Sequence, residues 1–349
     1  MLAPYAFAGL LAAVLGVLIS RYHLSDADKM YLTIIQGLAS FSGAWVARIL
    51  VSRANSLTVY RAALALIVFA FLSQSLFGFN LIAGFAVFSF GMGLLNPVMN
   101  VIALARGEGR LNQLTAVYSC GLALSPVASI FLGAANPKGY WTFLGVIGLS
   151  VLAGSHRSSG GPPRREPEIA ERLSAWRPSL NVWSMVVYQI ADAIVLRFLM
   201  VQASARGLNG FDAAACFSTY VSGIATGRLL ASRSKRLLRF HREKGWVSAA
   251  ATVQATYFMV HGEGMAQAIA GAFLAGFLAG PAYSAILSHA RDHDELMLIQ
   301  AAGTTAPLVC AMAVIRVAPA SLPLITPVLW LLFSALQLFG CRTSVPNRK

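Results

Sequence analysis

The carboxyl group of Asp192 is the side chain whose position most clearly suggests chemistry. It lies in the long apolar stretch 180–203, and Tyr188 and Gln189 precede it by four and three residues. At that spacing all three share one face of a helix. A carboxyl group with little water around it can take up and release a proton as its access to water changes. The stretch therefore predicts a proton-carrying group, and a static ion pair with a neighbouring helix is the alternative.

Arg197 follows Asp192 by five residues in the same stretch. In one helix the two side chains would be separated by about 7.5 Å along the axis and roughly 140° around it, so a direct pair would be strained. Each therefore needs a partner elsewhere. The planar guanidinium of Arg197 suits the binding of an anionic solute. It can equally extend to the outer membrane interface as a structural residue.

The elements that must position these residues are membrane helices. Of the 349 residues, 57% are apolar and 11% are charged, against about a quarter charged in an average soluble domain. This composition excludes a water-soluble enzyme. At about 20 residues per span, the apolar stretches predict twelve transmembrane helices, of which the sixth and ninth are short. They lie near 2–20, 30–50, 57–77, 81–105, 113–133, 140–154, 180–203, 211–231, 246–261, 265–288, 296–317 and 322–340.

The basic residues are distributed unevenly between the two ends of these spans. Lys and Arg accumulate in short cytoplasmic loops of membrane proteins. If the amino terminus is cytoplasmic, 21 of the 27 basic residues lie on the cytoplasmic side, five lie outside and Arg197 lies within a span. The asymmetry predicts that both termini are cytoplasmic. It also explains the formal charge of +14 as a topology signal, so no nucleic-acid partner is expected.

The chain divides into two similar halves. Residues 155–178 form its one long polar interruption and are expected to be a basic cytoplasmic linker between six-helix bundles at 1–154 and 179–349. An internal repeat supports this division, because the segment from Ser42 to Arg53 matches the segment from Ser222 to Arg233 at six of twelve positions, with an offset of 180. Weaker repeats pair the fourth span with the tenth and the fifth with the eleventh.

Two six-helix halves joined by a basic linker resemble the major facilitator superfamily of secondary transporters, and the resemblance runs from Tyr5 to Phe339. That family carries the motif Gly-x-x-x-Asp-Arg between its second and third helices. Ala47 and Gly227 stand at the aspartate position of the two copies here, so the usual charge latch cannot form. The resemblance implies a gating role for the retained motif residues, and close helix packing and dipole stabilisation are the alternative. These residues are Gly43, Arg48 and Arg53, with Gly223, Arg228 and Arg233 in the second copy.

Two subfamily signals compete. Asn96 with Pro97 and Asn100 is similar to the fucose and galactose type of proton symporter, whereas Gly121 with Ser125 and Pro126 is similar to drug/proton antiporters. The first span lacks the carboxylate of many sugar symporters, and the fourth lacks the arginine of many multidrug antiporters. The direction of transport is left open.

The resemblance implies that the first, fourth, seventh and tenth helices line a central cavity. It therefore places at a substrate site Asn96, Asn100, Tyr188, Gln189, Arg197, Tyr283 and Ser284. Hydrogen bonding between helices is the alternative for the asparagines. Simple packing is the alternative for Tyr283 and Ser284, which follow Pro281 on the tenth span.

No motif for catalysis or metal binding is present in the sequence. It contains no phosphate-binding Walker sequence, no nucleophile elbow and no His-Glu-x-x-His. The four cysteines and six histidines show no metal-ligand spacing. We therefore expect no enzyme activity, no cofactor and no metal.

The resulting prediction is an all-α membrane protein that moves a small organic solute by alternating access, with protons coupled through Asp192. It would be a monomer in the bacterial inner membrane, surrounded by lipid. Two alternatives are an uncoupled facilitator and a non-transporting assembly factor or sensor with the same architecture.

Overall fold

The computed structural model describes residues 2–12, 26–77, 80–133, 137–155, 180–205, 210–261, 265–288, 295–303 and 322–343, and the statements below concern these residues. All of them are helical except for short turns at 54–55, 80, 105–107 and 234. The helices are α1 (Leu2–Ala12), α3 (Asp26–Arg53), α4 (Ser56–Phe77), α5 (Leu81–Leu104), α6 (Glu108–Gly133), α7 (Pro137–Ser155), α8 (Leu180–Ala205), α9 (Gly210–Arg233), α10 (Lys235–His261), α11 (Met265–Ser288) and α13 (Leu322–Thr343).

The all-α prediction is confirmed. These helices, together with the helical residues 295–303, correspond one to one to the twelve predicted spans. Four described helices contain windows long and apolar enough to cross a membrane by length and composition, namely Ile34–Val51, Ser56–Phe77, Leu81–Leu104 and Ala266–Leu287. The predicted linker lies outside the described residues apart from Ser155.

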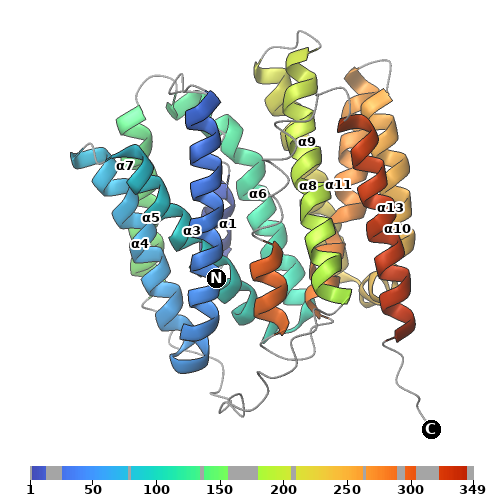
Figure 1. Ribbon diagram of the computed structural model, residues 1–349, viewed down its shortest axis with the longest axis horizontal. Helices are drawn as coiled ribbons and strands as arrows, with labels where there is room; N and C mark the ends of the chain where they lie inside the picture. The colour runs from blue at the N-terminus through green and yellow to red at the C-terminus, as the bar shows by residue number, and fades with distance from the viewer. Residues whose placement is uncertain are drawn as a thin grey trace.

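The helices stand side by side as a bundle, with α1 and α3 to α7 on the left of Figure 1 and α8 to α13 on the right. Between the two sets, α6 packs along α9. We use the term basic end for the end of the bundle where α3, α5, α9 and α11 finish and α4, α6, α8 and α10 begin. It is the end that the charge distribution predicts to be cytoplasmic.

Glycines bring the second and fourth helices of each set into backbone contact. A Cβ atom at Gly43 of α3 would lie 2.2 Å from the carbonyl oxygen of Phe90 on α5, and one at Gly223 of α9 would lie 2.2 Å from that of Phe273 on α11. Only glycine allows backbones to approach so closely. The paired residues are related by offsets of 180 and 183, so both copies of the repeat pack in the same way.

The reciprocal contacts repeat this relationship. A Cβ atom at Gly93 of α5 would lie 2.1 Å from the carbonyl oxygen of Ser40, and one at Gly276 of α11 would lie 2.0 Å from that of Tyr220. The offsets are again 183 and 180. Positions in the two sets can therefore be equated residue by residue around these contacts.

The α10 helix begins earlier than the predicted ninth span. We expected a basic loop before residue 246, but the helix starts at Lys235 and breaks at Lys244, where φ is −131° and ψ is 31°. Ser234 explains the early start, because its Oγ accepts a hydrogen bond from the backbone N–H of Leu237 at 3.2 Å, as an N-cap does. An exposed ion pair between Arg239 and Glu243, at 3.2 Å, follows one turn later.

Candidate functional site

The side chain of Arg228 joins the two sets of helices near the basic end. It is only 7% exposed. Its Nε donates to the carbonyl oxygen of Gly280 on α11 at 2.9 Å. Its Nη1 donates across to α6, to the carbonyl oxygen of Thr115 at 3.2 Å and to Oγ of Ser119 at 2.9 Å. One guanidinium thus bridges α9, α11 and α6.

A second bridge is made by Asn100 on α5. Its Nδ2 donates to the hydroxyl of Tyr283 on α11 at 2.9 Å and to Oε1 of Gln300 at 3.0 Å. Asn100 and Gln300 are both buried. An amide with two buried acceptors on the opposite set is a specific contact, because an unpaired buried amide costs free energy.

The ring of Tyr283 joins these two bridges. The guanidinium carbon of Arg228 lies 5.2 Å from its centroid, a cation–π distance. On α8, Tyr188 packs against the same ring with centroids 6.2 Å apart. Tyr188 also contacts the rings of Trp330 and Phe333 on α13. These aromatic contacts fix the lateral position of Arg228.

Asp192 lies on α8, one turn beyond Tyr188, and is half-buried. The hydroxyl of Tyr220 on α9 donates to its Oδ1 at 2.7 Å, and Tyr220 is fully buried. The carboxyl group lies within electrostatic range of Arg228, although the two form no direct ion pair.

Three buried polar atoms in this region have no hydrogen-bond partner among the described residues. They are the hydroxyl of Tyr188, Oγ of Ser284 and Nε2 of Gln300. The Tyr188 hydroxyl faces Arg228 and Asp192 without a hydrogen bond of normal geometry. Buried polar groups are paired in the great majority of native structures, so these three atoms stand out as hydrogen-bonding groups that the described residues leave unused.

The predicted substrate residues are brought together only in part. Asn100 and Tyr283 bond to each other, and Tyr188 and Ser284 belong to the same region. Asn96 lies one turn from Asn100, is half-buried and makes no hydrogen bond with the described residues. The amide of Gln189 bonds to Sδ of Met185, at 3.9 Å, and to no other described residue. The side chain of Arg197 lies outside the described residues.

The predicted gating residues differ between the two copies. Arg228 is buried in the bridge, whereas its equivalent Arg48 is half-buried with its guanidinium 5.3 Å from the ring centroid of Trp45. Arg53 and Arg233 are exposed. Gly43 and Gly223 make the close backbone contacts described above.

Sequence reasoning missed Tyr220, Gln300 and Thr115. A polar residue on an apolar span gave no indication of its partner. The repeat offset contained a usable signal, because Gln300 is equivalent to Tyr118 at the offset of 182 that relates Gly121 to Gly303. Because the motif here lacks its acidic residue, the sequence did not indicate a partner for Arg228. In the structure, neutral oxygens accept the hydrogen bonds of Arg228.

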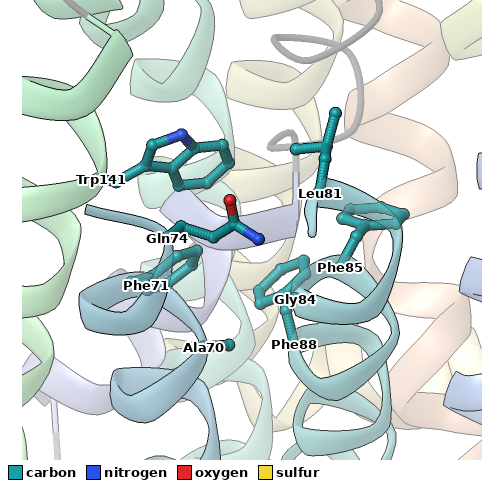
Figure 2. A pocket seen from close by; sticks show the side chains of 8 residues that line it. All are labelled: Ala70, Phe71, Gln74, Leu81, Gly84, Phe85, Phe88 and Trp141. Carbon is teal, nitrogen blue, oxygen red and sulfur yellow. The ribbon is translucent and has the colours of Figure 1, made fainter. Parts of the chain in front are cut away.

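A separate, shallow pocket lies between α4, α5 and α7. Figure 2 shows the amide of Gln74 pointing from α4 toward α5, among aromatic side chains. Nε2 of Gln74 donates to the carbonyl oxygen of Asn80 at 3.1 Å, so the polar group is already satisfied. The lining is otherwise apolar and consists of Ala70, Phe71, Leu81, Gly84, Phe85, Phe88 and Trp141. It lacks the polar groups that orient a solute.

No protein-family model matches the amino-acid sequence, and a search of curated proteins found no match. Solved structures of transporters share the fold over nearly the whole chain. Two structures of FucP, one described as the E. coli fucose:proton symporter and the other as a major facilitator superfamily transporter in the outward conformation, align with a TM-score of 0.72 and 15% identity, over 99% of this chain and 98% of theirs. The human organic anion transporter MFSD10 aligns with a TM-score of 0.72 and 13% identity, over 98% of this chain and 96% of its own. The chain therefore has the twelve-helix fold of major facilitator transporters.

Proposed function

We propose that this protein is a secondary active transporter that moves a small organic solute across the cytoplasmic membrane by alternating access. The halves 1–154 and 179–349 would rock around the site between them. The observation that carries the proposal is the pair of bridges made by Arg228 and Asn100. Both join one half to the other at one end of the bundle, and a transporter must close and open there once per cycle.

The bridges are suited to a gate because their bonds are few and reversible. Each net hydrogen bond contributes about 0.5 to 1.5 kcal/mol, so a handful can hold one end closed without making closure permanent. They lie at the basic end, so under this proposal the structure would correspond to a state closed toward the cytoplasm. One of the similar FucP structures is described as being in the outward conformation, which agrees with this assignment.

The gate would work without the acidic residue of the family motif. Arg228 bonds to two backbone carbonyl oxygens and one hydroxyl, and its charge is further stabilised by the Tyr283 ring. Neutral acceptors hold an arginine less strongly than a carboxylate does. We expect a latch of this kind to open at a smaller energetic cost than a charge pair.

Proton coupling is assigned to Asp192. Within the described helices it is a half-buried carboxyl group bonded to a buried tyrosine on the neighbouring helix, and the site's arginine lies within electrostatic range. A change in its protonation would alter contacts between α8 and α9, and this is how a proton would bias the rocking motion. FucP is described as a proton symporter. We propose proton coupling for this chain as well, with the direction of solute transport left open.

The test uses purified protein in liposomes that contain a pH-sensitive dye. A panel of sugars, organic acids and amphiphilic drugs is scanned for solute-dependent proton movement. We expect Asp192→Asn to lose proton movement while retaining exchange of labelled solute across the membrane. Glu243→Gln is the matched control, because Glu243 is 55% exposed on α10, and it should behave as wild type.

The other outcomes distinguish the alternatives. Solute flux that never moves protons and never exceeds the solute gradient would identify an uncoupled facilitator. Folded protein without flux for any member of the panel, but with a stable protein partner in a pull-down, would identify an assembly factor or sensor.

A further inference from the structure

The charge on Arg228 has no counter-charge in the protein. Within the described residues no carboxylate lies at ion-pair distance from its guanidinium, and the Asp192 carboxyl is bonded instead to Tyr220. Arg228 is 7% exposed, and an uncompensated charge at such a depth is costly. An anionic ligand would supply the compensation that the protein omits.

The guanidinium also retains free donors. Nε and Nη1 are bonded to Gly280, Thr115 and Ser119, whereas Nη2 makes no hydrogen bond of normal geometry with the described residues, and the Tyr188 hydroxyl lies beside the guanidinium. The bonded edge fixes the plane of the group, because Nε and Nη1 are held by two different helices. The Nη2 group is then presented in one fixed direction, in which it can donate a charge-assisted hydrogen bond to a carboxylate oxygen.

The unpartnered atoms nearby are of the type that an oxyanion needs. Nε2 of Gln300 is a donor only, and the hydroxyls of Tyr188 and Ser284 each carry a proton without an acceptor. Gln300 is tied to Tyr283 through Asn100, and the rings of Tyr283 and Tyr188 pack together beneath the guanidinium. The unused groups are therefore donors gathered around one cation.

We propose that the transported solute is a small organic anion whose carboxylate accepts a hydrogen bond from Nη2 of Arg228. Gln300 and Tyr188 would donate to its oxygens, and the aromatic rings would contact its apolar part. This inference rests on the proposed transport function and specifies the substrate class of that site. It replaces Arg197 with Arg228 as the anion-binding residue.

The same geometry couples the anion to a proton. Asp192 is faced by Tyr220 and Arg228 from α9, Tyr118 from α6 and Tyr188 on its own helix. Arg228 is the cation in this group, and it can attract either the carboxylate of the solute or that of Asp192. A proton on Asp192 removes the competitor, so anion and proton bind cooperatively and cross the membrane together.

The test measures binding by the full chain in detergent with matched acid and neutral probes, namely gluconate and glucose, lactate and lactamide, and benzoate and benzamide. The fluorescence of Trp330 reports binding, because its ring packs edge-on against that of Tyr188, with the two centroids 5.8 Å apart. A thermal melt run in parallel checks the fold of each variant. Because a charge-assisted hydrogen bond contributes about 1.5 to 3 kcal/mol, we expect at least one acid to bind about 10-fold or more tightly than its neutral partner.

Variants separate charge recognition from structural support. Arg228→Gln should abolish the preference for the acid, and Arg228→Lys should restore part of it, since the charge returns without the fork geometry. Arg236→Gln removes an exposed arginine at the start of α10 that belongs to neither the proposed site nor the gate, and it should leave the preference unchanged. A purely structural role for Arg228 would lower the affinity for acid and neutral probes equally.

Each outcome has one meaning. If no acid binds, or if the preference survives in folded Arg228→Gln protein, the inference is overturned. If only neutral probes bind and cross the membrane in liposomes, the inference fails while the transport proposal stands. If acids bind through Arg228 but no flux follows, the anion site stands and the transport proposal fails.

Discussion

Asn100 donates a hydrogen bond to the hydroxyl of Tyr283 at 2.9 Å, and the two residues occupy equivalent positions in the two halves of the molecule. They are 183 residues apart, as are Phe90 and Phe273, whose carbonyl oxygens meet Gly43 and Gly223 in the same way. The bond therefore joins corresponding points of the two halves. A contact of this kind is broken when the halves rotate apart.

Removal of this bond should favour opening at the basic end. Asn100→Ala deletes two hydrogen bonds between the halves, so we expect the ratio of the closed to the open population at that end to fall by about 30-fold, at about 1 kcal/mol per bond. Spin labels at Ala54 and Lys235, both exposed in the turns of the two halves, report the distance between them.

Tyr283→Phe provides the graded comparison. It keeps the ring beneath Arg228 and removes one of the two acceptors of Asn100. Its effect should be smaller than that of Asn100→Ala. An unchanged distance distribution in both variants would mean that Asn100 contributes to local packing and not to a gate.

Ser119→Ala should weaken the gate through Arg228. Ser119 is 2% exposed, and its Oγ is the side-chain oxygen that accepts from Nη1 of Arg228. Loss of this acceptor should cost about 1 kcal/mol and shift the same label distances toward the open state.

Ser73→Ala is the matched control for that change. Ser73 is 5% exposed and, like Ser119, bonds to a carbonyl oxygen one turn earlier in its own helix. It has no arginine partner among the described residues. If the two alanine variants shift the label distances equally, the hydroxyl of Ser119 is not part of the gate.

The helices could be predicted from the sequence because hydropathy is a property of each segment alone. Residue 96 and residue 100 could be placed on one face of a helix for the same reason. The residues that they contact could not be predicted, because the contact between Asn100 and Tyr283 depends on how two helices distant in the sequence pack together. The repeat contained part of this information, since the offsets of 183 and 180 relate the Gly93 contact with Ser40 to the Gly276 contact with Tyr220.

The role of Arg228 could not be predicted from the sequence motif. The sequence shows identical arginines at 48 and 228, yet only Arg228 is deeply buried and bridges to α6. A small residue at the aspartate position left both arginines without a predicted partner. The burial and hydrogen bonding of the two arginines therefore depend on the backbone carbonyl and hydroxyl groups of other helices that lie near them.

Gly223→Ala should destabilise the second half through backbone contact. The added Cβ would lie 2.2 Å from the carbonyl oxygen of Phe273 and 2.9 Å from the backbone nitrogen of Phe277, and neither atom can move without shifting α11. Overpacking of this kind costs about 1 to 3 kcal/mol. The melting temperature of the purified protein should fall by several degrees.

Gly154→Ala tests whether the loss is specific. Gly154 is helical, and an added Cβ would meet no atom within 4 Å. Alanine should be neutral or slightly stabilising there, because it has the higher helix propensity. Equal losses in the two variants would contradict the role of Gly223 as a close-packing position.

Burial lowers the pKa of His241 to about 4. The ring lies on the first segment of α10, and its Nδ1 is 3.2 Å from Oγ of Ser248, beyond the break at Lys244. The unfolded chain has the ordinary histidine pKa of about 6.5, so below that value it binds more protons than the folded protein. His241 therefore weakens folding progressively as the pH falls from about 6.5 to 4, and it leaves stability unchanged above that window.

The pKa difference corresponds to a loss on the order of 3 kcal/mol at the acid end of this window. Because the charged ring must leave its contacts with Ser248 and Phe240, the segment 235–243 should detach first. Hydrogen exchange of its backbone amides, corrected for the intrinsic pH dependence, should accelerate between pH 6.5 and 4 in wild type. In His241→Gln, which cannot acquire a charge, the corrected rates should stay constant. A similar acceleration in both proteins would show that His241 is not the group responsible.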